Sequence, residues 1–238
     1  MTKEKIYQEL TKALTIKGVD IPALLALQAN IKADLLSEAT TASKGGSKAK
    51  TAVINSILKE AKTLINCDES RREKYNFMLN SLKVNDYQVF STNYRFIATT
   101  EHTPHEIIED PTIYSTYNRL INDCLGVPSQ IVYLPELNQL KAAIKIVKAS
   151  KPAKNKNVIV CLNDVVNVNG DYLVDLMTWT GSREAKTTAG NAKVCICSDD
   201  NKNIGVILPI YKYKTCVKPD LFIDKDNQII FTNEPATA

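Results

Sequence analysis

The chain carries its clearest helix-start and helix-stop signals in the stretch VNGDYLVDLMTWTGS, residues 168–182. Gly170 and Asp171 introduce a predicted helix over residues 172–179, and Gly181 ends it, because glycine readily takes the left-handed conformation found just after helices. Two apolar β-type runs follow at residues 192–198 and 205–211, joined by the polar turn DDNKN. The last third therefore has the order strand, helix, strand, turn, strand.

Strands and a second helix precede this module. Residues 158–162 and 130–134 are short apolar runs that predict strands. Between them, Pro135 opens a helix that gives way to the lysine-rich loop SKPAKNKN, residues 150–157. The apolar side of this helix is formed by Leu137, Leu140, Ala143 or Ile144, and Val147.

Residues 53–98 are predicted to form a helix followed by a small meander of strands. Apolar residues recur at three- and four-residue spacing between Val53 and Ile65, which predicts a helix ending near Asn66. The β-type runs that follow are residues 75–79, 82–84, 87–90 and 94–98, with turn signals at 85–86 and 92–93. A further short helix is predicted over residues 113–125.

Both ends of the chain differ from this body. Residues 1–38 repeat apolar residues at helical spacing around Gly18 and predict a helical hairpin. Residues 39–52 have the composition of a flexible linker, which leaves 53–212 as the body. Residues 213–238 are predicted as a C-terminal tail that contains a hairpin between residues 222 and 230.

Composition narrows the function classes only broadly. The 238 residues are 44% hydrophobic, enough for a sizeable core, and the net charge of +4 leaves the partner type open. No apolar run follows Met1, and none approaches the ~20 residues of a membrane helix, so we expect a cytoplasmic protein with no membrane contact. The six cysteines then fit reduced, mostly buried thiols.

Two stretches resemble a known family. Residues 168–176 are similar to the start of the final helix in bacterial sliding clamps, the β subunits of DNA polymerase III, and Gly181-Ser182 matches a pair that often follows it. Residues 205–210 are similar to that family's terminal apolar-Met-Pro-apolar run. Residues 75–98 resemble a strand pair of its middle domain, although this chain lacks the glycine and has Tyr94 where histidine is usual.

The similarity covers about residues 53–100 and 130–212, so the chain is too short for three clamp domains. It implies a reduced or divergent clamp with an α+β fold of clamp-like antiparallel sheets and helices, in addition to the N-terminal hairpin. The implied function is a DNA processivity factor or tether that binds double-stranded DNA without sequence specificity. Such a protein is a homo-oligomer that docks DNA polymerase or other clamp-binding peptides, with no catalysis, metal or cofactor.

A row of lysines is the predicted DNA-binding surface. No acidic residue occurs between Glu136 and Asp164, and lysine contacts with phosphate are indifferent to base sequence. The candidate residues are Lys141, Lys145 and Lys148 on one helix, then Lys151, Lys154 and Lys156 in the following loop. A solvated helix face is the alternative explanation of the same pattern.

The resemblance also implies a groove for partner peptides. Its positions here are Tyr75, Thr92, Tyr94, Arg95 and Phe96 on one side and Val206, Leu208, Pro209 and Ile210 on the other. Exposed apolar and aromatic anchors with a polar rim suit peptide recognition. The alternative is that Val206, Leu208 and Ile210 are simply a buried strand face.

The sequence leaves two other functions open. One is a monomeric DNA-binding or protein-interaction adaptor that keeps the clamp fold and uses the same candidate residues. A small metal- or thiol-dependent enzyme would centre on His102, His105 and Cys124, with Glu109 as a further ligand candidate, although Pro104 disfavours a helical ligand pair. Cys195 and Cys197 point to one face of a predicted strand, a spacing more typical of a core than of a redox centre.

Overall fold

The computed structural model describes residues 48–66, 76–128, 130–152, 156–164, 166–187, 193–210 and 218–232. The chain divides into two compact units, Met1–Ala49 and Lys50–Ala238. The predicted N-terminal hairpin, residues 1–38, lies outside the described residues. The strands and helices below belong to the second unit, except that the first described helix, residues 48–66, begins two residues before its boundary. The second unit is a mixed α+β structure built on two sheets.

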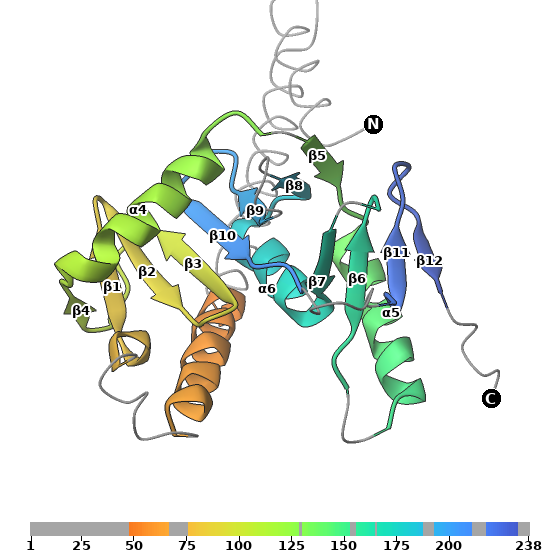
Figure 1. Cartoon of the computed structure of the whole chain (residues 1–238), viewed down its shortest axis with the longest axis horizontal. Coiled ribbons are helices and arrows are strands. Elements are labelled where there is room, and N and C mark those ends of the chain that lie inside the picture. Colours follow the sequence, from red (N-terminus) through yellow and green to blue (C-terminus); the bar gives the residue numbers. More distant parts are fainter. Residues whose placement is uncertain are drawn as a thin grey trace, which may run out of the picture. The chain divides into compact units, whose positions relative to one another are not determined.

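The larger sheet has eight strands and runs across most of the unit (Figure 1). Every neighbouring pair is antiparallel except β4 with β1. In spatial order the strands are β4 (Ile107–Ile108), β1 (Ser81–Val84), β2 (Tyr87–Ser91), β3 (Arg95–Thr99), β10 (Asn203–Ile207), β9 (Val194–Cys197), β8 (Glu184–Thr187) and β5 (Gln130–Tyr133). Two strands about a hundred positions apart in sequence therefore meet at its centre, where β3 pairs with β10.

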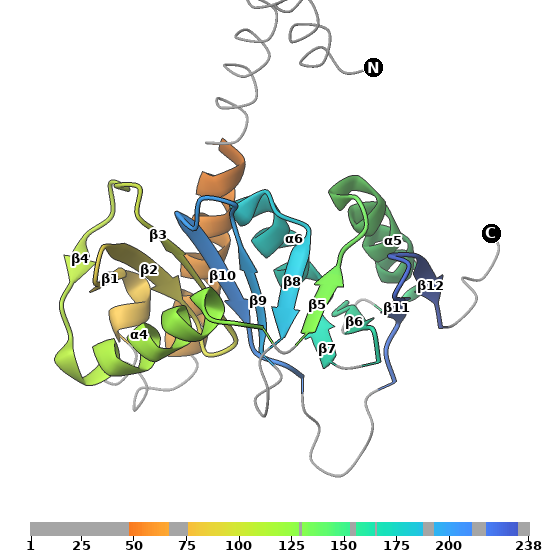
Figure 2. The same cartoon turned by 90° about the horizontal axis from the view of Figure 1, so that it is seen from above.

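Helices cover both faces of this sheet. The helix α4 (Pro111–Leu125) lies on one side, and α6 (Gly170–Thr180) lies on the other with the helix over residues 48–66 (Figure 2). The two faces follow from strand alternation, because successive side chains point in opposite directions. In β2, for example, Val89 packs in the cluster under α4, whereas Phe90 packs in the cluster under α6.

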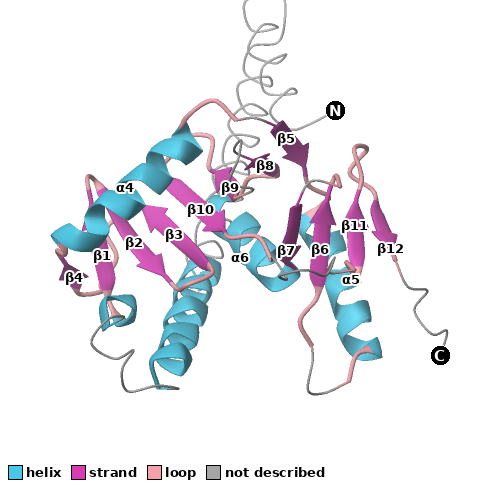
Figure 3. Ribbon diagram, viewed as in Figure 1, coloured by secondary structure: helices cyan, strands magenta, loops and turns pink. Residues whose placement is uncertain are grey.

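A second sheet of four strands carries the remaining helix (Figure 3). Its order is β12 (Ile229–Phe231), β11 (Leu221–Ile223), β6 (Ile159–Leu162) and β7 (Val166–Asn169), with β11 and β6 parallel. The helix α5 (Leu137–Ser150) buries Leu140, Ala143, Ile144 and Val147. These residues join the same core cluster as the inward residues of β6, β7 and β11, which confirms the predicted apolar side of this helix.

The boundaries of α6 follow from its own sequence. The side chain of Asn169 accepts hydrogen bonds from the backbone N–H groups of Asp171 and Tyr172, which satisfies two donors at the helix start. Gly181 ends the helix at φ +69, in the left-handed region that favours glycine. The predicted stop at Gly181 is confirmed, whereas the helix begins at Gly170, two residues before the predicted start.

Most predicted strands are confirmed, and one is wrong. Residues 76–79, predicted as part of a β-type run, form a 3-10 helix, η1 (Asn76–Leu79). The backbone N–H of Asn80 bonds to the Phe77 carbonyl, and Met78 is buried with Ala61 and Ile65 of the 48–66 helix. Packing against that helix, rather than strand pairing, decides the local structure. Strands β4 and β8 were not expected from the sequence.

Two predicted domain boundaries also differ from the structure. Residues 48–52, assigned to the linker 39–52, already belong to the first described helix. The segment 213–238, assigned to a separate tail, supplies β11 and β12, and β11 pairs with β6 of the body. The hairpin predicted within that segment is confirmed, but it is a structural part of the second sheet and not an appendage.

Candidate functional site

Several predicted groove residues come together at one pocket. Thr92, Arg95 and Phe96 from the β3 side, and Val206 and Leu208 from the β10 side, line a pocket of about 290 Å³. We call this cavity the α4 pocket, because α4 forms its opposite wall with Ile113, Tyr117 and Leu120, while η1 adds Phe77 and Met78.

The floor of the α4 pocket is set by strand register. Phe96 of β3 pairs directly with Val206 of β10, and their side chains are 3% and 0% exposed. For these two residues the buried-strand interpretation is therefore correct, and they support the pocket from beneath. Leu208 follows the end of β10, is 40% exposed, and donates its backbone N–H to the Tyr94 carbonyl at 2.8 Å. It is the accessible apolar residue of this rim.

The α4 wall is held in place by Tyr117. Its hydroxyl donates a hydrogen bond of 2.7 Å to Ser91 Oγ, and its ring meets that of Phe96 edge-on at 5.4 Å. Burial raises the pKa of Tyr117, so the hydroxyl stays protonated and keeps donating. Upstream, the Asp110 side chain caps the helix and Pro111 occupies its first turn. This wall of the pocket is thus held by contacts within the chain itself.

Three other predicted groove residues lie elsewhere. Tyr94 is 50% exposed beside the pocket but does not line it. Pro209 and Ile210 are half-buried, and the Ile210 N–H donates to the Asn167 carbonyl of β7 at 2.8 Å. The strand end after Leu208 therefore leads away to the second sheet. Tyr75 is outside the described residues.

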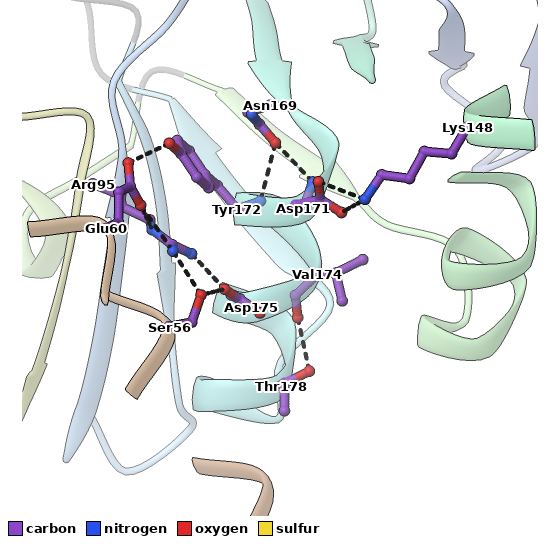
Figure 4. A network of polar contacts seen from close by, with 10 residues as sticks. All are labelled: Ser56, Glu60, Arg95, Lys148, Asn169, Asp171, Tyr172, Val174, Asp175 and Thr178. Carbon is purple, nitrogen blue, oxygen red and sulfur yellow. Dashed lines mark hydrogen bonds and ion pairs between the residues drawn. The ribbon is translucent and has the colours of Figure 1, made fainter. Parts of the chain in front are cut away.

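Arg95 has a different role from the predicted one, because its guanidinium is engaged by acidic groups (Figure 4). It donates from Nε to Glu60 at 3.1 Å and from Nη2 to Ser56 Oγ at 3.0 Å, and it forms an ion pair with Asp175. The side chain is 3% exposed. Since both carboxylates engage this cation, it fastens the 48–66 helix and α6 to β3 and is not a free rim charge for a peptide.

Tyr172 completes this network. The Arg95 guanidinium lies 4.2 Å from the centre of the Tyr172 ring, a favourable cation–π arrangement. The Tyr172 hydroxyl donates to Glu60 (Figure 4). Burial is the largest cause that raises the pKa of Tyr172 well above its ordinary value, and this hydrogen bond to the carboxylate is the second. The hydroxyl therefore remains a donor throughout the physiological range.

Two of the predicted DNA-binding lysines form ion pairs with acidic residues. Lys148 Nζ contacts both carboxylate oxygens of Asp171 at 2.6 and 2.7 Å, and Lys151 Nζ contacts Asp220 at 2.6 Å. These two carboxylates come from distant parts of the sequence, so the lack of acidic residues between Glu136 and Asp164 did not reveal them. Lys141, Lys145 and Lys156 are exposed, whereas Lys154 lies outside the described residues.

Two exposed lysines on another helix were not predicted. Lys59 and Lys62 lie on the solvent side of the 48–66 helix, which buries Ile57, Ala61 and Ile65 on the other. Helical spacing was a usable signal, because both lysines fall between the apolar positions.

The candidate metal or thiol residues do not converge. The His105 ring packs edge-on against Phe90 at 5.1 Å, on the α6 side of the large sheet. Cys124 is buried on the α4 side, next to Cys195. Across the described ranges, no group of three His, Cys, Asp or Glu side chains is arranged to hold a metal ion.

Comparisons with protein-family models, with curated proteins and with solved structures find no match to this chain. Among the described helices, none is long and apolar enough to cross a membrane. The features of the molecule that bear on function are the α4 pocket and the exposed lysines.

Proposed function

We propose that this protein is a non-catalytic, sliding-clamp-like tether. It docks a short apolar segment of a DNA polymerase or another partner in the α4 pocket, and it contacts double-stranded DNA through exposed lysines. The observation that supports this most directly is the pocket. Residues from 92–96 and 206–208, more than a hundred positions apart in sequence, line one cavity.

The walls of the α4 pocket suit an apolar side chain with a peptide backbone across the rim. Ile113, Leu120 and Leu208 offer apolar contact, and the polar residues Thr92 and Thr116 are also among those that line the pocket. Burying one leucine or phenylalanine contributes roughly 1.5–3 kcal/mol. A micromolar complex needs about 8 kcal/mol, so the partner must add backbone hydrogen bonds and further contacts outside the pocket.

Exposed lysines support the DNA part of the proposal. Lys141, Lys145 and Lys156 are exposed, and no ion pair occupies them in the described part of the chain. Each lysine that neutralises a phosphate releases counterions, which weakens binding as salt rises and requires no particular base sequence. This is the behaviour a sliding tether needs.

The end of the large sheet supports a homo-oligomer. The strand β5 ends the eight-stranded order, and a terminal strand offers backbone groups for pairing with another chain. Its outward residues Ile131 and Tyr133 are 41% and 51% exposed, and Val127 just before it is 96% exposed. Such an apolar edge favours association between copies.

Peptide docking is tested by anisotropy with a fluorescent decapeptide that carries adjacent leucine and phenylalanine. Leu208→Glu should weaken its binding at least tenfold, because it puts a charge on the accessible pocket rim. Ile230→Glu is the matched control, since Ile230 is 47% exposed on the other sheet and should bind normally. Equal binding by wild type and both variants would rule out the α4 pocket as the docking site.

DNA binding is tested with nicked circular and linear duplexes over a salt series. Retention on circles together with loss from linear ends would establish encirclement. Native mass spectrometry on the same sample gives the number of subunits. A monomer at micromolar concentration that still binds the peptide would favour the adaptor function instead, and no DNA binding even at low salt would overturn the DNA part of the proposal.

A further inference from the structure

Three buried thiols meet between α4 and the large sheet, on the side away from Arg95. Cys124 lies in the last turn of α4, and Cys195 and Cys197 lie on β9 with their side chains in the same core cluster. Their exposed fractions are 1%, 0% and 7%. The sulfur atoms of Cys124 and Cys195 are 2.8 Å apart, closer than an ordinary contact between two thiols.

The backbone around this pair is fixed by contacts that do not involve the two sulfur atoms. Lys193, whose side chain is 8% exposed, forms an ion pair with Asp123, the residue before Cys124. On the other side, the Cys197 thiol lies 3.7 Å from the Cys124 carbonyl oxygen. These contacts hold the last turn of α4 against β9, and the two thiols meet as a result.

We propose that Cys124 and Cys195 form an intramolecular disulfide bond under oxidising conditions, which fastens the last turn of α4 to β9. With glutathione disulfide as oxidant, one cysteine thiolate attacks a glutathione sulfur and releases one glutathione thiol. The second cysteine attacks the mixed disulfide and releases another. The two cysteines lose two electrons and two protons in total, and one glutathione disulfide becomes two glutathione thiols.

The same burial that brings the thiols together slows their oxidation. The hydrogen bond from Cys124 to Cys195, together with burial, raises the pKa of Cys124 well above its ordinary value, so little thiolate is present at neutral pH. An oxidant reaches the pair only when the last turn of α4 opens. The reaction is therefore slow and should accelerate as pH rises.

The proposed disulfide would restrain α4, the helix that also forms one wall of the α4 pocket. The same α4 carries Ile113, Tyr117 and Leu120 along the α4 pocket, so fixing its last turn restricts how far that wall can move. This inference stands apart from the proposed tether function, because it depends only on the thiol geometry. It holds whether or not a peptide binds.

The test begins with reduced full-length protein incubated overnight in glutathione disulfide, followed by alkylation in denaturant and peptide mass spectrometry. The expected product is a peptide pair linked through Cys124 and Cys195, with a mass lower by two hydrogen atoms and full reversal by dithiothreitol. The thermal midpoint should rise by roughly 5–10 °C on oxidation. Complete alkylation of both thiols, or links that join other cysteines instead, would overturn the proposal.

Variants separate this pair from the other thiols. Cys195→Ser should abolish the linked product, whereas Cys197→Ser and Cys161→Ser should keep it, since neither residue supplies one of the paired sulfur atoms. The wild-type measurement decides the proposal if Cys195→Ser fails to fold. A linked product that disappears in Cys197→Ser would show that Cys197, and not Cys195, is the partner of Cys124.

Discussion

Gly205 of β10 lies directly beneath Leu176 of α6, and a Cβ atom on residue 205 would come within 2.3 Å of the Leu176 Cγ atom. The strand and the helix approach each other this closely only because residue 205 has no side chain. Since Val206 and Phe96 on the opposite face form the pocket floor, this contact also sets where that floor lies.

Gly205→Ala should lower the free energy of unfolding by about 1–3 kcal/mol, because the added methyl group forces Leu176 or the strand to move. Urea denaturation followed by circular dichroism measures this. Gly126→Ala is the matched control, since its new Cβ meets only backbone oxygens of α4 at 3.3 and 3.6 Å. An equal loss in both variants would contradict the packing argument.

Arg95→Met should destabilise the protein by about 2–3 kcal/mol, because it removes the cation that neutralises Glu60 and Asp175. The expected loss is below that of a fully buried pair, since the carboxylates keep 20% and 24% exposure. Lys202→Met is the control, because the ion pair of Lys202 with Asp200 is exposed on both sides and should contribute little to stability. Thermal denaturation of both variants gives the comparison.

Tyr117→Phe should cost about 1 kcal/mol, because it deletes the hydrogen bond to Ser91 and leaves that hydroxyl buried without its donor. The pocket wall should become more mobile, which hydrogen exchange of the α4 amides would detect. Tyr133→Phe, at an exposed position, serves as the control. Unchanged stability in Tyr117→Phe would show that the hydrogen bond does not hold α4.

Acid stability should depend on the turn between β9 and β10. Hydrogen bonds from Ser198 and Lys202 lower the pKa of Asp200 from 3.8 to about 2. A lowered folded pKa means that the stabilisation is present above the unfolded value and is lost as pH falls from about 3.8 towards 2. Asp200→Asn should therefore flatten the pH dependence of the thermal midpoint in that window. Ser198→Ala should reproduce part of the effect, and superimposable curves would contradict it.

The lysines should fall into two groups, one that stabilises the fold through ion pairs and one that contacts DNA. Lys151→Gln should reduce stability by roughly 1 kcal/mol, because it leaves Asp220, at 13% exposure, without its cation. Lys141→Gln and Lys145→Gln should leave stability unchanged but flatten the salt dependence of DNA binding, by about one unit of slope for each lost phosphate contact. A filter-binding salt series measures this. Salt slopes equal to that of wild type would remove both lysines from the DNA surface.

The predicted elements succeeded where the signal is local. Gly181, predicted as the end of α6, stops the helix by its own left-handed backbone conformation. The apolar side of α5 follows from helical spacing alone. Residues 76–79 failed for the opposite reason, because burial against the 48–66 helix, and not their own β propensity, decides their conformation.

The candidate site likewise combines features that local sequence determines with contacts that only the fold creates. The sequence by itself determined which residues are apolar and, within a few residues, where helices begin and end. Only the tertiary structure decided that Arg95 faces Glu60 and Asp175, that Lys148 meets Asp171, and that Cys124 touches Cys195. Helical periodicity and caps act over one or two turns, whereas these contacts join residues more than twenty positions apart, and the pairing of the strands brings them together.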